Sequence, residues 1–72
     1  MCLAVPGKIK AVNNNIARVD IMGIEKDVDI ELVEDVNIGD LILIHAGFGI
    51  EKIDSEYFNY LEKVFKEEIS DG

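Results

Sequence analysis

Apolar and polar residues alternate in three segments of the first half of the chain, residues 7–12, 16–21 and 24–32, and this two-residue period limits the possible folds more than any other feature. In residues 7–12 the apolar Ile9 and Ala11 alternate with lysines, and residues 16–21 repeat the pattern. Such a period places apolar side chains on one face of a β-strand and polar side chains on the other. The first part of the sequence therefore predicts short strands, each with one buried face.

Turn-forming residues separate the predicted strands. Three asparagines at residues 13–15 predict a hairpin, because asparagine tolerates a positive φ. A Met-Gly pair at 22–23 and a Gly-Asp pair at 39–40 mark further turns. Between them, residues 24–32 alternate acidic and apolar side chains, with Lys26 as the exception. The residues expected on the buried face are Ile24, Val28, Ile30 and Leu32.

The segment LILIH, residues 41–45, predicts a central, well-buried strand that ends at His45. The glycine-rich residues 47–49 then permit an unusual backbone path. From Asp54 onward the apolar spacing becomes three and four, which is typical of an amphipathic helix with Asp54 or Ser55 as N-cap. Its apolar stripe comprises Tyr57, Phe58, Leu61, Val64, Phe65 and Ile69.

Together these segments predict a single domain of mainly β structure. Four or five short antiparallel strands occupy about residues 1–52, and one C-terminal helix occupies about residues 54–69. A small set of strands must close or be covered to protect its edges. The expected fold is therefore a small OB-like antiparallel β-barrel with a docked C-terminal α-helix.

A chain of 72 residues forms a thin core, for which small secreted domains compensate with disulfides. One cysteine cannot form a disulfide within the chain, so a reducing, cytoplasmic setting is expected. The sequence shows no signal peptide and no apolar run of about 18 residues, so no membrane association is expected.

Acidic residues outnumber basic residues by 15 to 7, which gives a net charge of −8. Binding to nucleic acid depends on clustered lysines and arginines that release counterions, so nucleic acid is not an expected partner. The acidic surface either serves solubility or complements a basic surface on a partner.

The single cysteine, Cys2, directly follows the initiator methionine. Methionine is removed before small residues, so the mature chain is expected to begin at Cys2, with a thiol and an α-amine on one residue. A thiolate is both a soft ligand and a nucleophile. The alternative is an incidental cysteine at a loose chain end.

The single histidine, His45, is either a structural residue at a strand end or a metal ligand. A cysteine and a histidine are too few for a structural zinc site, which has four ligands. The pair suits an incomplete site that a partner completes, or a carrier that releases its cargo. Thiolate and imidazole favour iron, zinc or copper over magnesium or calcium.

Two segments carry a family resemblance. MCLAVPGKI at residues 1–9 resembles the N-terminal signature of the HypC/HupF hydrogenase maturation chaperones. GDLILIHAGFGI at residues 39–50 resembles their second signature, and GIEKDVDIELV at residues 23–33 resembles the hairpin between the two. Gly49 departs from the alanine that the family usually has there.

The resemblance implies a small β-barrel with a C-terminal helix and a role in building the Fe(CN)2CO group of [NiFe]-hydrogenases. It implies a complex with a HypD-type maturation protein, which carries an iron–sulfur cluster. The chain would then escort the iron unit to the precursor of the hydrogenase large subunit. By position, Cys2 would be the thiol that contacts the iron, and His45 would be the candidate second ligand.

The N-terminal arm is the expected contact for a partner. Leu3, Ala4 and Val5 form an apolar cluster, Pro6 is expected to restrict the arm at its junction with the barrel, and Gly7 to turn the chain into the first strand. The full set of expected partner-binding residues is Cys2, Leu3, Ala4, Val5, Pro6, Gly7, Gly47 and Phe48.

Two other functions compete with this one. A hydrolase with an N-terminal cysteine nucleophile would use the terminal amine as its base, but it needs a larger scaffold with an oxyanion hole, so the chain is not expected to be an enzyme. The other is an OB-fold-like protein- or single-strand nucleic-acid-binding module. Binding of single strands needs a basic groove and stacking aromatics, whereas here three of the five aromatic residues lie on the helix stripe.

Overall fold

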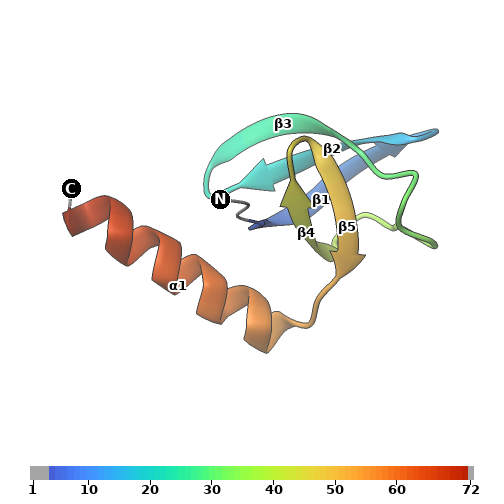
Figure 1. Ribbon diagram of the computed structural model, residues 1–72. Helices are drawn as coiled ribbons and strands as arrows, with labels where there is room; N and C mark the ends of the chain where they lie inside the picture. Colours follow the sequence, from blue (N-terminus) through green and yellow to red (C-terminus); the bar gives the residue numbers. More distant parts are fainter. Residues whose placement is uncertain (1–3, 72) are drawn as a thin grey trace.

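A computed structural model describes the backbone of residues 4–71 and the side chains of residues 4–66 (Figure 1). Five strands precede one helix: β1 (Val5–Asn13), β2 (Ile16–Ile21), β3 (Ile24–Asp29), β4 (Leu41–His45), β5 (Phe48–Lys52) and α1 (Ser55–Asp71). The strands form a closed barrel in the order β1-β2-β3-β5-β4. The predicted mainly β fold, a small barrel with one C-terminal helix, is confirmed.

Two of the predicted turns, those at 13–15 and 22–23, join consecutive strands into hairpins. Asn14 lies between β1 and β2 with a φ of 57°, in keeping with the tolerance of asparagine for this region. Met22 and Gly23 join β2 to β3 with φ values of 51° and 94°. Two positive φ values in a two-residue loop match the twist of the flanking strands, which fixes the pairing of β2 with β3.

The barrel closes through one short parallel contact. β1 pairs with β2 and β4, β2 with β3, and β4 with β5, all in antiparallel orientation. β3 and β5 are parallel and are paired at Asp29 and Phe48. The expectation of antiparallel strands is therefore wrong for this one pairing. The β4–β5 hairpin folds back between β1 and β3, which leaves β5 running in the same direction as β3.

Aliphatic side chains from β1 to β4 fill the barrel. The buried cluster comprises Ile9, Ala17, Val19, Val28, Ile30, Ile42 and Ile44. The prediction that Ile24 and Leu32 are buried is wrong, because they are 62% and 63% exposed. Ile24 begins β3 beyond the packed part of the barrel, and Leu32 lies after β3 has ended at Asp29. The two-residue period continues past the point where the chain turns away from the core.

Pro6 and Gly7 lie inside β1, which begins at Val5, and both are buried. Pro6 is opposite Leu43 of β4, whereas pairing with β2 begins at Lys8, so the missing N–H of proline costs no bond to β2. A Cβ atom on Gly7 would lie 2.5 Å from Val19 Cγ1. Gly7 therefore admits neighbouring side chains within a strand, and the expectation that it turns the chain into β1 is wrong.

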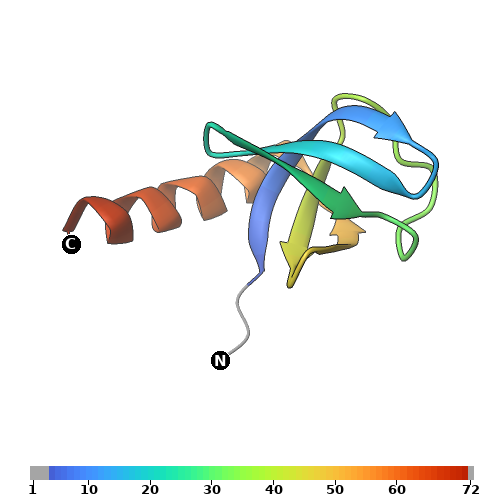
Figure 2. The same ribbon diagram turned by 90° about the horizontal axis from the view of Figure 1, so that it is seen from above.

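Asp54 starts the helix. Its Oδ1 accepts a hydrogen bond of 2.8 Å from the backbone N–H of Tyr57, which is the geometry of an N-cap. α1 contacts β1 and β4, and its C-terminal half extends away from the barrel in both views (Figures 1 and 2). The apolar stripe is half-buried at Phe58, Leu61, Val64 and Phe65, exposed at Tyr57, and outside the described side chains at Ile69. In the described part of the chain, α1 is too short and too polar to cross a membrane.

Candidate functional site

His45 is the last residue of β4, as its position in the sequence predicts, and it is half-buried. It pairs with Phe48 across the β4–β5 hairpin. Ala46 and Gly47 form the two-residue turn between them, with φ values of 55° and 86°. The hydrogen bonds between described side chains do not involve the imidazole. Both ring nitrogens are therefore available, within the described part of the molecule, for a ligand or partner.

The N-terminal arm enters the barrel beside this strand end. β1 and β4 are antiparallel, and their pairing begins with Val5 opposite Ile44, the residue before His45. Cys2 and Leu3 lie outside the described residues. The chain length alone limits how far Cys2 can be from Ala4, since two residues span at most about 7 Å. The register thus brings the attachment point of the predicted thiol next to the predicted histidine.

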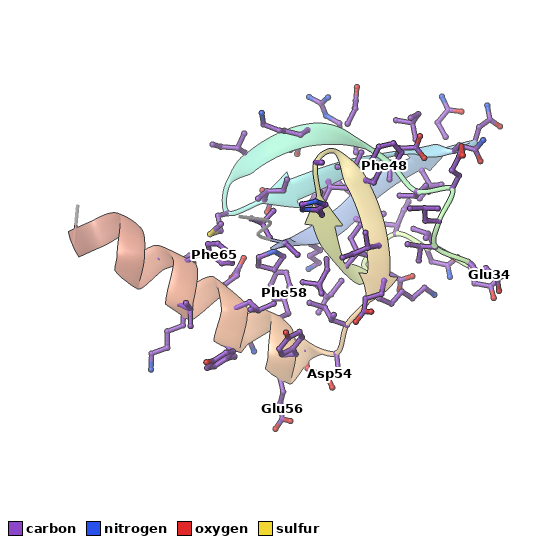
Figure 3. The ribbon with its side chains drawn as sticks, in the orientation of Figure 1. Glu34, Phe48, Asp54, Glu56, Phe58 and Phe65 are labelled. Atoms are coloured by element: carbon purple, nitrogen blue, oxygen red, sulfur yellow. The ribbon has the colours of Figure 1, made fainter. Side chains whose placement is uncertain are left out.

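The other predicted contact residues divide into a surface group and a buried group. Val5 is half-buried, Gly47 is exposed, and Phe48 keeps 43% of its surface exposed beside the same turn. Phe48 lies near β3 on the far side of the barrel from Phe58 and Phe65, which lie on α1 (Figure 3). Pro6 and Gly7 are buried, so they can influence a partner through the path of β1 and not through exposed surface.

The described residues include no group of three or more histidine, cysteine, aspartate or glutamate side chains that could hold a metal ion. His45 could supply one nitrogen ligand from this region. A complete coordination sphere would have to draw on Cys2, on a partner, or on both.

The Gly-Asp pair that begins the second signature has a structural role. The Asp40 carboxylate accepts a 2.8 Å hydrogen bond from the backbone N–H of Asn37 and lies 3.3 Å from Lys52 Nζ. The Asn37 N–H, with a smaller contribution from Lys52, holds the pKa of Asp40 below its usual value. This loop is fastened to the barrel, because Gly39 N donates to Ile9 O and Ile9 N donates to Asp40 O, at 2.9 and 2.8 Å.

Sequence reasoning missed two features here. One is the ion pair of Lys52 with Asp40, which joins segments too distant in the chain for any local pattern to reveal. The other is the left-handed backbone of Ala46. A two-residue loop between paired strands requires positive φ values, so a predicted hairpin with His45 and Phe48 as its paired ends would have revealed this backbone.

Comparison with known proteins gives one match that includes both Cys2 and the strand that ends in His45. The profile of the HupF/HypC family matches residues 1–65. The chain belongs to the HupF/HypC family. The resemblance found in the two signatures is thereby confirmed over nearly the whole sequence.

Individual relatives agree with this assignment. The chain is 45% identical over 58 residues to the hydrogenase maturation factor HypC of Helicobacter hepaticus, covering 78% of this chain and 67% of the relative. It is 42% identical over 57 residues to HypC of Rhizobium leguminosarum bv. viciae, covering 78% and 76%. It is 40% identical over 63 residues to the hydrogenase maturation factor HybG of Escherichia coli K12, covering 78% and 77%.

Proposed function

We propose that this HupF/HypC family member is a [NiFe]-hydrogenase maturation chaperone. With a HypD-type partner it holds the Fe(CN)2CO unit during assembly, and it then escorts this cargo to the precursor of the hydrogenase large subunit. The family match and the relatives named as hydrogenase maturation factors support this class of function. The chain acts as a carrier in the cytoplasm and not as an enzyme.

The observation that carries this proposal is the register of β1 with β4. Val5 faces Ile44, so the arm that bears Cys2 leaves the barrel beside His45. We assign Cys2 as the thiolate ligand of the iron and His45 as the second ligand from this chain. Thiolate suits low-spin Fe(II), the state that cyanide and carbon monoxide favour. The HypD-type partner supplies the remaining contacts.

The placement of the two ligands fits a transient site. A thiol on a terminal arm can enter a cleft of the partner, whereas a thiol on a barrel strand cannot. The imidazole binds iron when it is neutral, because protonation removes its lone pair.

The proposal is tested by co-purifying the tagged protein from hydrogenase-producing cells and recording infrared spectra of the eluate. We expect cyanide and carbonyl bands with the natural chain and none with Cys2→Ala or Cys2→Ser, because a hydroxyl is not ionised at neutral pH. Residue 2 precedes β1, so the melting temperature of both variants should be unchanged. Normal hydrogenase maturation by Cys2→Ala would refute the central role of the thiol.

His45→Ala separates the ligand role from a structural one. If His45 is a ligand, the variant loses iron while the barrel and the complex with the HypD-type partner remain intact. If it is structural, the variant loses stability because the packing of the half-buried ring is lost, and its folded fraction still retains iron. Iron content of the complex and the melting temperature of the isolated variant, measured together, distinguish the two.

A further inference from the structure

The first part of β3 lies at an open edge of the barrel. β2 pairs with β3 along its whole length, from Ile24 to Asp29. On the other side β5 pairs with β3 at Asp29 alone. In both views β3 begins at the β2–β3 turn, away from β5, and approaches β5 at its end (Figures 1 and 2). Residues 24–27 are all exposed, so this edge is accessible to another chain.

The alternation of the antiparallel ladder identifies the backbone groups on this edge. A two-residue turn makes Ile21 and Ile24 a hydrogen-bonded pair, so the backbone groups of Lys26 and Val28 also face β2. Those of Glu25, Asp27 and Asp29 then face away from β2. The hydrogen bond of Asp29 is consistent with this orientation, because its N–H donates to Gly47 O, on the side away from β2, at 2.9 Å.

Glu25 and Asp27 have no corresponding partner on this side. Beyond the strand ladders, the backbone hydrogen bonds among residues 4–71 do not include either residue. Each presents one N–H and one C=O to solvent, in the spacing that a neighbouring strand would use. A row of this kind is a template for the addition of a strand.

We propose that this edge of β3 binds an extended, basic segment of another protein as an added antiparallel strand. This inference goes beyond the proposed function and does not depend on it. The charge on the outer face of the hairpin determines the basic character of the segment. Asp20, Glu25, Asp27 and Asp29 share that face, and Arg18 lies among them.

Arg18 neutralises this face in part. Its Nε lies 3.3 Å from Glu25 Oε1, and its Nη1 lies 3.0 Å from Asp27 Oδ1. The side chains of Glu25 and Asp27 remain 49% and 65% exposed. Arg18 and Lys8, which is opposite Asp20 in β1, are outnumbered by the four carboxylates, so an excess of negative charge remains, which lysines or arginines at alternate positions of an added strand would offset.

A second copy of this chain is a poor occupant of the same edge. Any antiparallel pairing of two β3 edges through the free backbone groups places Glu25 or Asp27 opposite a carboxylate of the other copy. Like charges directly opposite each other destabilise a pair of strands. Lys26 lies on the other face of β3 and is exposed, and a lysine on an edge strand opposes indiscriminate apolar pairing.

The side chains along this edge therefore specify which residues an added strand should carry, and in which order. Lysines would lie opposite Asp27 and Glu25, a small polar residue opposite Lys26, and apolar residues opposite Ile24 and Val28. The matching probe is a capped peptide containing Val-Lys-Thr-Lys-Val. The control peptide has both lysines replaced by glutamate.

The test is amide hydrogen exchange measured by NMR on the isolated protein, with each peptide at millimolar concentration. With the basic peptide, exchange of the Glu25 and Asp27 amides should slow, whereas the Lys26 amide, already bonded to β2, should be unchanged. The glutamate peptide should have no effect. Binding of the basic peptide without slower exchange at Glu25 would mean charge attraction alone, and would overturn the proposal, as would no binding.

Asp27→Ala and Asp27→Pro form a matched pair of variants. Both remove the same carboxylate, but proline also removes the outward-facing N–H and leaves the ladder with β2 intact. Protection of the Glu25 amide by the basic peptide should persist in Asp27→Ala and be lost in Asp27→Pro. Equal protection in both variants would refute strand addition. If Asp27→Pro does not fold, the exchange pattern of the natural chain decides the question by itself.

Discussion

Replacing Gly7 by alanine tests the packing at the start of β1. The new Cβ would lie 2.5 Å from Val19 Cγ1 and 2.7 Å from Ile44 Cδ1. Contacts under 3 Å force the neighbours to move. Val19 is fully buried and has a stiff, β-branched side chain, so it can yield little. The end of the Ile44 side chain is freer to shift.

The expected cost follows from two opposing effects. Overpacking a core by a methyl group costs about 1–3 kcal/mol. Replacing glycine by alanine in a permitted backbone conformation stabilises by about 0.4–1 kcal/mol, because the unfolded chain loses freedom. We therefore expect Gly7→Ala to lower the free energy of unfolding by about 1–2 kcal/mol, which is a drop of roughly 5–15 °C in Tm for a domain of this size.

Urea unfolding followed by circular dichroism measures this change. Gly49→Ala is the matched control, because its Cβ would approach Ile42 Cδ1 no closer than 3.1 Å. Gly49→Ala should be nearly neutral. Ile44→Val removes the Cδ1 atom that the added methyl group would strike, so the cost of Ile44→Val should shrink in the Gly7→Ala background. Equal stability of the Gly7→Ala and natural proteins would refute the account of this close approach.

Three further changes test other parts of the fold. The folded-state pKa of Asp40 is lowered, so the carboxylate's stabilising effect is complete above the unfolded value of 3.8 and is lost as pH falls through the lower folded value. Urea unfolding at neutral and at strongly acidic pH should therefore show that Asp40→Asn loses less stability on acidification than the natural protein. Ala46→Asn creates an Asn-Gly turn suited to positive φ and should stabilise by about 0.5–1 kcal/mol, seen as a higher Tm. Asp54→Ala removes the N-cap of α1 and should cost about 1 kcal/mol and some helical circular dichroism, whereas unchanged helicity would argue against the cap.

The sequence predicted the strands best where local signals agreed. The asparagines before Ile16 and the Met-Gly pair before Ile24 fixed two hairpins, because a turn residue and a two-residue period met at the same point. The end of β3 could not be predicted in this way. Leu32 continues the apolar alternation, but the chain has left the barrel before that residue. The barrel is closed by the pairing of β5 with the end of β3, and nothing about Leu32 itself reveals this.

The candidate site was predicted in its parts and not in its arrangement. The apolar run before His45 placed the histidine at a strand end, and this position is confirmed. That β1 lies beside β4, with Val5 facing Ile44, depends on pairing between segments far apart in the chain, and no local pattern contains it. The role of Cys2 as an iron ligand stays a prediction, because Cys2 lies outside the described residues.

The pairing of β1 with β4 also determines how the protein responds to force. A pull on the N-terminal end of β1, directed along the strand, loads its pairing with β4. The four pairs from Val5 to Lys8 lie along this line, and their hydrogen bonds run across it. Such a load acts on these hydrogen bonds in shear. They must then break together, and cannot open one after another from one end of the strand. The start of β1 can therefore bear a load along the strand without unravelling the barrel.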